Sequence, residues 1–266
     1  MAGLPDLDAI AGELRLGIAE EAFSGCDGVL VRPKGIRRGI IAVRRDIRSR
    51  GRKRFTIAHE IGHYILPGHE EDGAICGSAD IEGWGGAASS RERQADDFAA
   101  ELLIPASVVR PSLSSPSLAA VDRIASQCDT SLSASAWRFC DLTGEMCAVV
   151  WSEQGKVVWV KKSSDFGFFI PRGMSTDRNT YAYTCFQRKQ VPARPESVPA
   201  DAWIDSANLV DGARIFEESR LLPSYDSVLT LLWIKGNIRR RSEHDEESEE
   251  PLDPLDFTVY RKRWPK

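Results

Sequence analysis

The chain has 266 residues, of which 42% are hydrophobic and 28% charged, and its formal net charge is -4. This length and composition suffice for a buried core and for two or three folding units, while the net charge argues against non-specific attraction to nucleic acid. The sequence begins with neither a basic stretch nor an apolar run, and no segment reaches membrane-spanning length. We therefore expect a soluble cytoplasmic protein that does not bind a membrane.

The first elements are predicted to be a helix over residues 7–21 and strands over 28–31 and 39–43. Residues 40–44 directly precede the next helix, and they form either an inner strand or an edge strand that pairs with an extended substrate. Residues 44–54 then carry seven positive charges in eleven positions. This run indicates either a solvated loop or a surface that attracts an acidic partner or a phosphate.

Residues 55–66 contain the motif His-Glu-x-x-His, in which His59 and His63 are four positions apart and Glu60 follows His59. On a helix over residues 52–66 the two histidines share a face and can bind one metal ion. Glu60 can lie beside the ion and accept a proton from a metal-bound water. The alternative is a structural helix whose histidines only satisfy neighbouring polar groups.

Hydrolytic zinc normally takes three protein ligands and a water, so one ligand is missing from the motif. His69 follows His63 by six residues, as in metzincins, but that pattern also requires a glycine where this chain has Leu66. Tyr64 and His69 are close enough in sequence to be candidates for stabilising the oxyanion of the reaction.

Residues 89–105 have the pattern of an amphipathic helix, and Glu92 and Asp96 share one of its faces. Glu92 can be the third metal ligand, while Asp96 can accept the second ring N–H of a ligand histidine. Glu92 can equally form a capping box with Ser89 at the start of the helix. Spacing alone leaves both interpretations open.

Together, residues 54–63 and 92–105 resemble the ImmA/IrrE family of bacterial and phage metallopeptidases. This resemblance implies a gluzincin-like site in which His59, His63 and Glu92 bind the metal, Glu60 is the catalytic base, and Asp96 supports a ligand histidine. Glu101, on the same helix, is expected to be solvated or structural. The implied cofactor is zinc, with manganese as an alternative, and the implied substrate is a helix-turn-helix repressor of stress-response or mobile-element genes.

After Pro105, residues 111–117 read as a linker, followed by helices over 118–128 and 133–143. The pattern resembles a helix-turn-helix unit, which longer members of the family carry after the peptidase core. The second helix offers only one basic side chain, Arg138, to a DNA groove, so we expect a structural hairpin that does not bind nucleic acid.

From residue 146 onward, strand patterns dominate. Residues 147–151 and 156–160 flank Gln154-Gly155 and should form a hairpin, with further strands at 213–216, 227–234 and 257–261. The resemblance implies a GAF-like domain here, a type that often senses small molecules, and residues 166–172 also resemble longer family members. The tract 239–250 is expected to be a solvated loop, and His244 within it is not a metal-site candidate.

The sequence thus predicts an α+β protein with a minimal zincin-like peptidase domain (1–111), a helix-turn-helix-like unit (112–145) and a β-rich GAF-like domain (146–266). Its predicted activity is zinc-dependent cleavage of a cytoplasmic protein. Two alternatives remain: a regulator that uses the zincin scaffold to bind a repressor or DNA, and a metal or redox sensor. The six cysteines lack Cys-x-x-Cys spacing, so core thiols are expected, with a redox role for Cys76 as the alternative.

Overall fold

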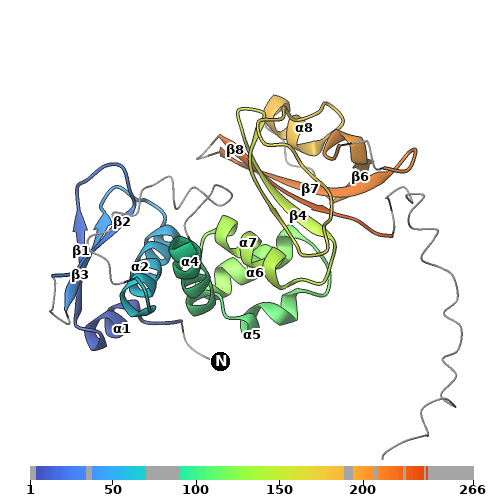
Figure 1. Cartoon of the computed structure of the whole chain (residues 1–266). Helices are drawn as coiled ribbons and strands as arrows, with labels where there is room; N and C mark the ends of the chain where they lie inside the picture. Colours follow the sequence, from blue (N-terminus) through green and yellow to red (C-terminus); the bar gives the residue numbers. More distant parts are fainter. Residues whose placement is uncertain are drawn as a thin grey trace, which may run out of the picture.

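The computed structural model describes residues 4–33, 38–69, 90–188, 194–205, 209–223, 226–236 and 238. Helices and two separate sheets make up these ranges (Figure 1), which confirms the predicted α+β class. Within them, no helix is both long and apolar enough to cross a membrane. Four predicted features fall outside the described residues: Ser89, Cys76, the tract 239–250 with His244, and the strand at 257–261.

The N-terminal sheet has three strands in the order β1-β3-β2, with β1 parallel and β2 antiparallel to β3. The bounds are β1 Leu16–Glu21, β2 Gly28–Val31 and β3 Gly39–Arg44. The prediction of one helix over residues 7–21 is wrong in its second half, because helix α1 ends at Glu13 and Arg15 adopts a positive φ of 60°. All six residues of β1 then pair with β3, which outweighs their local helical pattern.

Strand β3 lies in the middle of this sheet, so residues 40–44 form an inner strand and not an edge. Its buried side chains Ile41 and Val43 face the core beneath the sheet. Strand β2 is one of the two edges, and helix α2 (Arg50–Ile65) packs against both β2 and β3.

Most of the positive charges in residues 44–54 have acidic partners within the fold. Arg44 and Arg52 both contact the fully buried Asp27. The other pairs join Arg45 to Glu21, Lys53 to Glu20, and both Arg50 and Arg54 to Asp129. The run is therefore largely neutralised by the molecule itself, which weakens the interpretation as a phosphate-binding surface.

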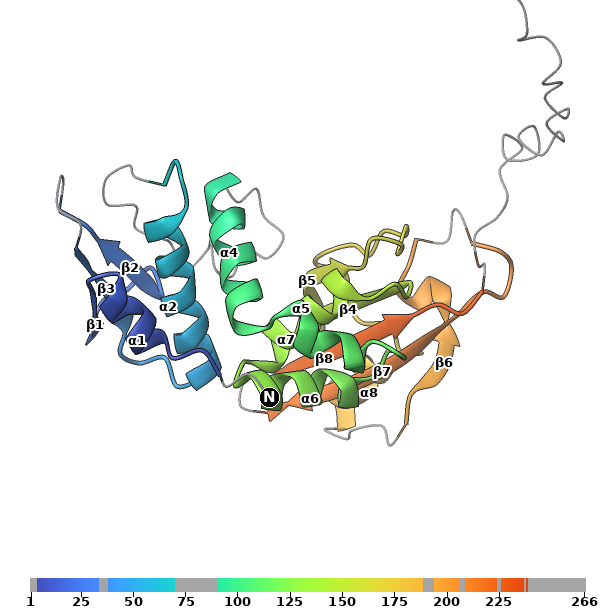
Figure 2. The ribbon, with the colours of Figure 1, turned by 90° about the horizontal axis from the view of Figure 1, so that it is seen from below.

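Helix α4 (Ser90–Leu103) lies beside α2 in both views (Figures 1 and 2), and the two helices form the centre of the N-terminal half. The predicted linker over residues 111–117 is shorter than expected. Helix α5 (Ala106–Val109) and a 3-10 turn (Arg110–Ser112) occupy the region after α4, and Val109 is completely buried.

Helices α6 (Leu118–Cys128) and α7 (Leu132–Leu142) form the predicted hairpin. The turn between them packs against the start of α2: a Cβ atom added to Gly51 would lie 2.4 Å from the backbone nitrogen of Ser131. Arg50 also contacts Asp129 in this turn at 2.8 Å. A helix-turn-helix protein inserts the start of its second helix into DNA, and α2 covers that end here.

The C-terminal sheet has five antiparallel strands in the order β5-β4-β8-β7-β6. The bounds are β4 Cys147–Glu153, β5 Lys156–Lys162, β6 Glu196–Pro199, β7 Arg214–Leu222 and β8 Ser227–Trp233. The β4-β5 hairpin turns at Gln154 and Gly155, both with positive φ, as a tight two-residue turn requires. Strand β6 and helix α8 (Tyr181–Arg188) were not predicted.

Two apolar clusters hold the molecule together. The first runs without interruption from the N-terminal sheet through α2, α4 and the α6-α7 hairpin to one face of the C-terminal sheet, where it includes Val149 and Leu231. The second lies on the other face of that sheet and includes Ala182 and Cys185 of α8, together with Phe166 and Ile170 from the segment 166–172. The hairpin therefore serves as the layer that joins the two sheets.

Candidate metal centre

Helix α2 carries both histidines and the glutamate of the predicted site. The side-chain oxygen of Ser49 accepts a hydrogen bond from the backbone N–H of Arg52 at 3.3 Å, which caps the start of the helix. His59, Glu60 and His63 lie on the buried part of the helix, and Glu60 is completely inaccessible to solvent. Burying three polar side chains on one helix costs free energy of folding unless they bind a ligand or form hydrogen bonds.

Helices α2 and α4 approach each other closely because small residues face each other between them. A Cβ atom added to Gly62 of α2 would lie 3.0 Å from the ring of Phe98 and 3.3 Å from the Cα atom of Ala95, both on α4. Ala95 and Ala99 are completely buried. The mid-helix glycine, which costs about 1 kcal/mol in helix propensity, therefore lets α4 bring its side chains onto the histidine face of α2.

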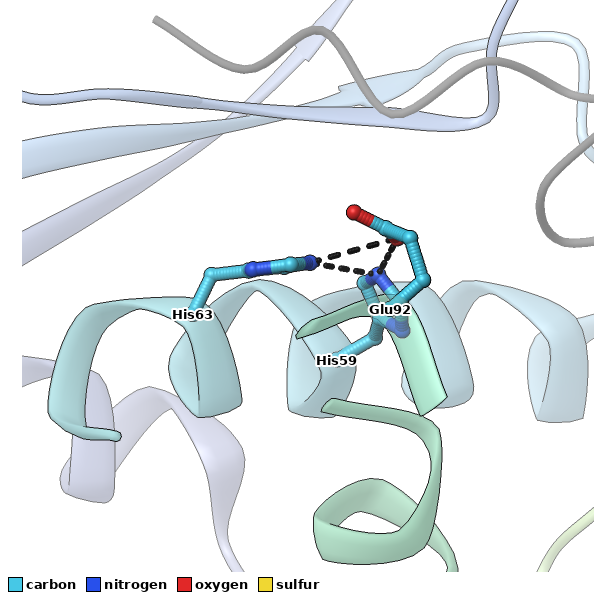
Figure 3. Close-up of side chains that lie close together, drawn as sticks. All are labelled: His59, His63 and Glu92. Carbon is cyan, nitrogen blue, oxygen red and sulfur yellow. Dashed lines mark hydrogen bonds and ion pairs between the residues drawn. The ribbon is translucent and has the colours of Figure 1, made fainter. Parts of the chain in front are cut away.

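Three potential metal-binding atoms converge where the helices meet (Figure 3). The Nε2 atoms of His59 and His63 are 2.9 Å apart, and they lie 3.2 and 3.4 Å from Oε2 of Glu92. Ligand atoms about 2.1 Å from a tetrahedral zinc ion lie about 3.4 Å from one another. The spacing and the nitrogen and oxygen donors therefore suit zinc.

The surroundings keep these donors in their metal-binding forms. The contact with His59, followed by that with His63, holds the pKa of Glu92 well below its ordinary value and outweighs the opposing effect of burial, so the carboxylate stays ionised. The Nδ1 atom of His59 lies 2.9 Å from Oδ1 of Asp96. Because a carboxylate accepts this hydrogen bond, His59 carries a proton on Nδ1, and its Nε2 atom, on the side of Glu92, is the nitrogen that a metal ion would bind.

Glu60 lies on the side of α2 that strand β2 covers. A Cβ atom added to Gly28, the first residue of β2, would lie 3.1 Å from Oε1 of Glu60 and 2.4 Å from Cγ2 of Thr56. A side chain at this position would require the side chain of Thr56 or Glu60 to move. The carboxylate is thus held between α2 and the beginning of an edge strand.

The structure brings together His59, His63 and Glu92 and places Asp96 behind His59, as the sequence analysis expected; their roles in binding and catalysis remain predictions. Glu92 faces the histidines, whereas the capping-box alternative depends on Ser89, outside the described residues. Glu101 contacts Arg138 of α7, away from the histidines.

His69 does not take the place of a third ligand or an oxyanion donor. Its Nδ1 atom lies 2.9 Å from Nδ1 of His63, on the side of that ring opposite the metal-binding nitrogen. Tyr64, the other oxyanion candidate, packs its ring beneath Arg32, whose guanidinium carbon is 5.7 Å from the ring centroid. Sequence reasoning missed Gln94, which contacts His69, and no motif pointed to it.

The model of the IrrE N-terminal-like domain, Peptidase_M78, matches residues 18–126. Over these residues the chain is similar to that family. The match spans both metal-site helices and ends within α6. It confirms the resemblance to the ImmA/IrrE family and supports a metallopeptidase-type function for this part of the chain. No curated protein matches the chain.

Proposed function

We propose that the protein is a zinc-dependent endopeptidase in which His59, His63 and Glu92 hold the ion. The convergence of these donors, none more than 3.4 Å from another, within a peptidase family domain is the observation that carries the proposal. Zinc bound there supplies a Lewis acid for the scissile carbonyl and lowers the pKa of its water ligand to about 7. Manganese is the alternative ion.

Glu60 is the general base of the proposed reaction. Glu60 directly follows His59 on α2, so its side chain projects next to the metal-binding face, and it is completely buried. It removes a proton from the attacking water and later delivers that proton to the leaving amine. His59, held by Asp96 at 2.9 Å, and His63 keep the metal site fixed relative to this base.

The substrate is proposed to bind as an extended segment along strand β2. Among the described residues β2 pairs only with β3, so its other edge is available for backbone hydrogen bonds. Gly28 brings the start of that strand against Glu60. As the family resemblance implies, the proposed substrate is a helix-turn-helix transcriptional repressor, and its cleavage releases stress-response or mobile-element genes.

The test is cleavage by the full-length protein loaded with zinc, compared with the variant Glu60→Gln. A proteome-derived peptide library and candidate helix-turn-helix repressors serve as substrates, and mass spectrometry identifies the products. We expect the variant to retain zinc but to lose about 10²- to 10⁴-fold in rate, the usual contribution of a general base. Metal analysis of the same samples shows whether the ion is still bound.

The same variant separates the peptidase from a non-proteolytic regulator. If Glu60→Gln still relieves repression in cells as the wild type does, and the wild type yields no peptide product, the protein acts by binding. A metal sensor instead predicts a zinc-dependent conformational change without cleavage in either protein.

A further inference from the structure

Behind the candidate metal centre lies a second pair of contacts that the proposed reaction does not use. His69 is buried, with 6% of its surface exposed, and its two ring nitrogens face different partners. Nδ1 lies 2.9 Å from Nδ1 of His63, and Nε2 lies 3.0 Å from the side-chain oxygen of Gln94 on α4.

The chain turns sharply to bring His69 back against α2. Helix α2 ends at Ile65, Gly68 adopts a positive φ of 79°, and the backbone N–H of His69 contacts the carbonyl of Leu66 at 3.4 Å. Arg32 in turn donates to the carbonyl of His69 at 3.3 Å. These contacts fix the His69 backbone, so its ring has a defined position behind His63.

The hydrogen-bond pattern determines which nitrogen of each ring carries a proton. The side-chain oxygen of Gln94 can only accept, so neutral His69 carries its proton on Nε2 and presents an unprotonated Nδ1 to His63. His63 must then donate from its own Nδ1. The ring nitrogen of His63 left for a metal ion is then Nε2, the atom that lies 3.4 Å from Oε2 of Glu92.

We propose that His69, oriented by Gln94, is a positioning residue that fixes the tautomer and ring orientation of His63 for metal binding. It does for His63 what Asp96 does for His59, and α4 supplies both anchors as well as Glu92. A neutral imidazole in this place supports the ligand without adding a second negative charge to the centre. The proposal rests on the metal site of the proposed function but not on peptide cleavage.

The first readout is the tautomer of His63 in the metal-free, full-length protein. The chain has only 4 histidines, so selective ¹⁵N labelling gives an NMR spectrum in which the ring nitrogens can be assigned at mildly alkaline pH, where imidazole is neutral. We expect His63 to be protonated on Nδ1 in the wild type. In His69→Leu, which removes the acceptor, we expect this preference to be lost. In His69→Asn, whose side-chain oxygen can occupy the place of Nδ1, it should be restored.

The second readout is zinc affinity, measured by competition with a chelator. Loss of such a supporting contact typically weakens metal binding by about 10- to 100-fold, which we expect for His69→Leu but not for His69→Asn. Gln94→Leu should weaken binding in the same direction without a risk to folding, because Gln94 is exposed. Gln127→Leu, at an exposed position on α6, is the matched control and should leave affinity unchanged.

The proposal is overturned if His69→Leu keeps both the His63 tautomer and the zinc affinity of the wild type. It is also overturned if the Asn and Leu variants lose affinity equally, since His69 would then serve only packing. Failure of the proposed function looks different: the wild type would bind zinc with His63 in the expected tautomer and yet cleave no substrate.

Discussion

Glu217 shows how a single buried carboxylate organises the C-terminal sheet. The side chain is completely inaccessible on strand β7 and accepts hydrogen bonds from the backbone N–H of Ala182 at 2.8 Å, the indole N–H of Trp203 at 3.0 Å and the hydroxyl of Ser219 at 2.8 Å. It therefore ties the start of α8 and the turn at Trp203 to the sheet.

This carboxylate predicts a specific dependence of stability on pH. Burial raises the pKa of Glu217 above its ordinary value, although its hydrogen-bond donors oppose the shift. Because the folded pKa lies above the unfolded one, about 4.3, the stabilisation is complete below that pH and is lost as the pH rises through the folded pKa. We expect the free energy of unfolding of the wild type, relative to Glu217→Gln, to be greatest at acid pH and to fall toward neutrality.

Denaturant unfolding of both proteins across a pH series, followed by tryptophan fluorescence, measures this difference. Glutamine does not titrate, so the comparison cancels the other ionisable groups. A difference that stays constant or grows with pH would contradict the assignment of a raised pKa to Glu217.

Individual residues of the metal centre were predictable to different degrees. His59 and His63 follow from their spacing alone, since a four-residue step places two side chains on one face of any helix. Glu92 needed the family resemblance, because the same position also suits a helix cap. The contact of His69 with Gln94 was not predictable: it depends on the turn at Gly68 and on the packing of α4, neither of which a local pattern encodes.

At the scale of elements, the α2-α4 pair makes the metal centre possible. The two ligand histidines come from one helix and the carboxylate from the other, so the interhelical distance sets the ligand spacing. Gly62 sets that distance, since its missing side chain leaves room for Ala95 and Phe98.

Gly62→Ala should separate the helices. The added methyl group would lie 3.0 Å from Phe98 and 3.3 Å from Ala95, and overpacking of this kind typically costs about 1–3 kcal/mol, more than the gain of about 1 kcal/mol in helix propensity. Because zinc tolerates only about 0.2 Å of error in ligand distance, we expect zinc affinity to fall on the order of tenfold. Calorimetric zinc titration measures the effect.

Gly12→Ala is the matched control, because a Cβ atom at Gly12 of α1 would meet no atom within 4 Å. It should leave zinc affinity unchanged. Equal affinities for the Gly62 and Gly12 variants would show that the helix spacing does not control the site.

The elements were predicted best where one residue pattern dominates. Helix α6 has the predicted bounds, and the β4-β5 hairpin follows from its two-residue turn. Residues 16–21 were predicted to be helical, but they form a strand by parallel pairing with β3. Because β3 is distant in the sequence, the local residue pattern does not indicate this pairing. Strand β6 was missed for a similar reason: its four residues are stabilised by pairing with β7.

At the scale of the whole molecule, the α6-α7 hairpin connects the metal centre to the C-terminal sheet. On one side, its turn packs against Gly51 of α2 and Arg138 contacts Glu101 of α4. On the other side, Asp122 pairs with Arg220 of β7. The α6-α7 hairpin thus contacts both metal-site helices and the C-terminal sheet.

Gly51→Ala should weaken the packing of α2 against the turn of the α6-α7 hairpin. The added methyl group would lie 2.4 to 2.9 Å from backbone atoms of Thr130 and Ser131, which cannot rotate away. We expect the free energy of unfolding to fall by about 1–3 kcal/mol. At about 2–4 °C per kcal/mol, this lowers the melting temperature by several degrees. Scanning calorimetry compares it with Gly144→Ala, where the added atom meets nothing within 4 Å. Matching melting temperatures for the two variants would contradict the packing argument.

The continuity of the first apolar cluster bears on how the chain can be divided. The family match stops at residue 126, inside α6, whose buried side chains Val121 and Ile124 belong to the same cluster as Phe139 of α7 and Leu231 of the sheet. A fragment cut at that point would leave these side chains facing water. An exchange of the peptidase part by recombination would therefore have to include the α6-α7 hairpin. The end of the family match is not a boundary at which the chain can be divided without exposing the core.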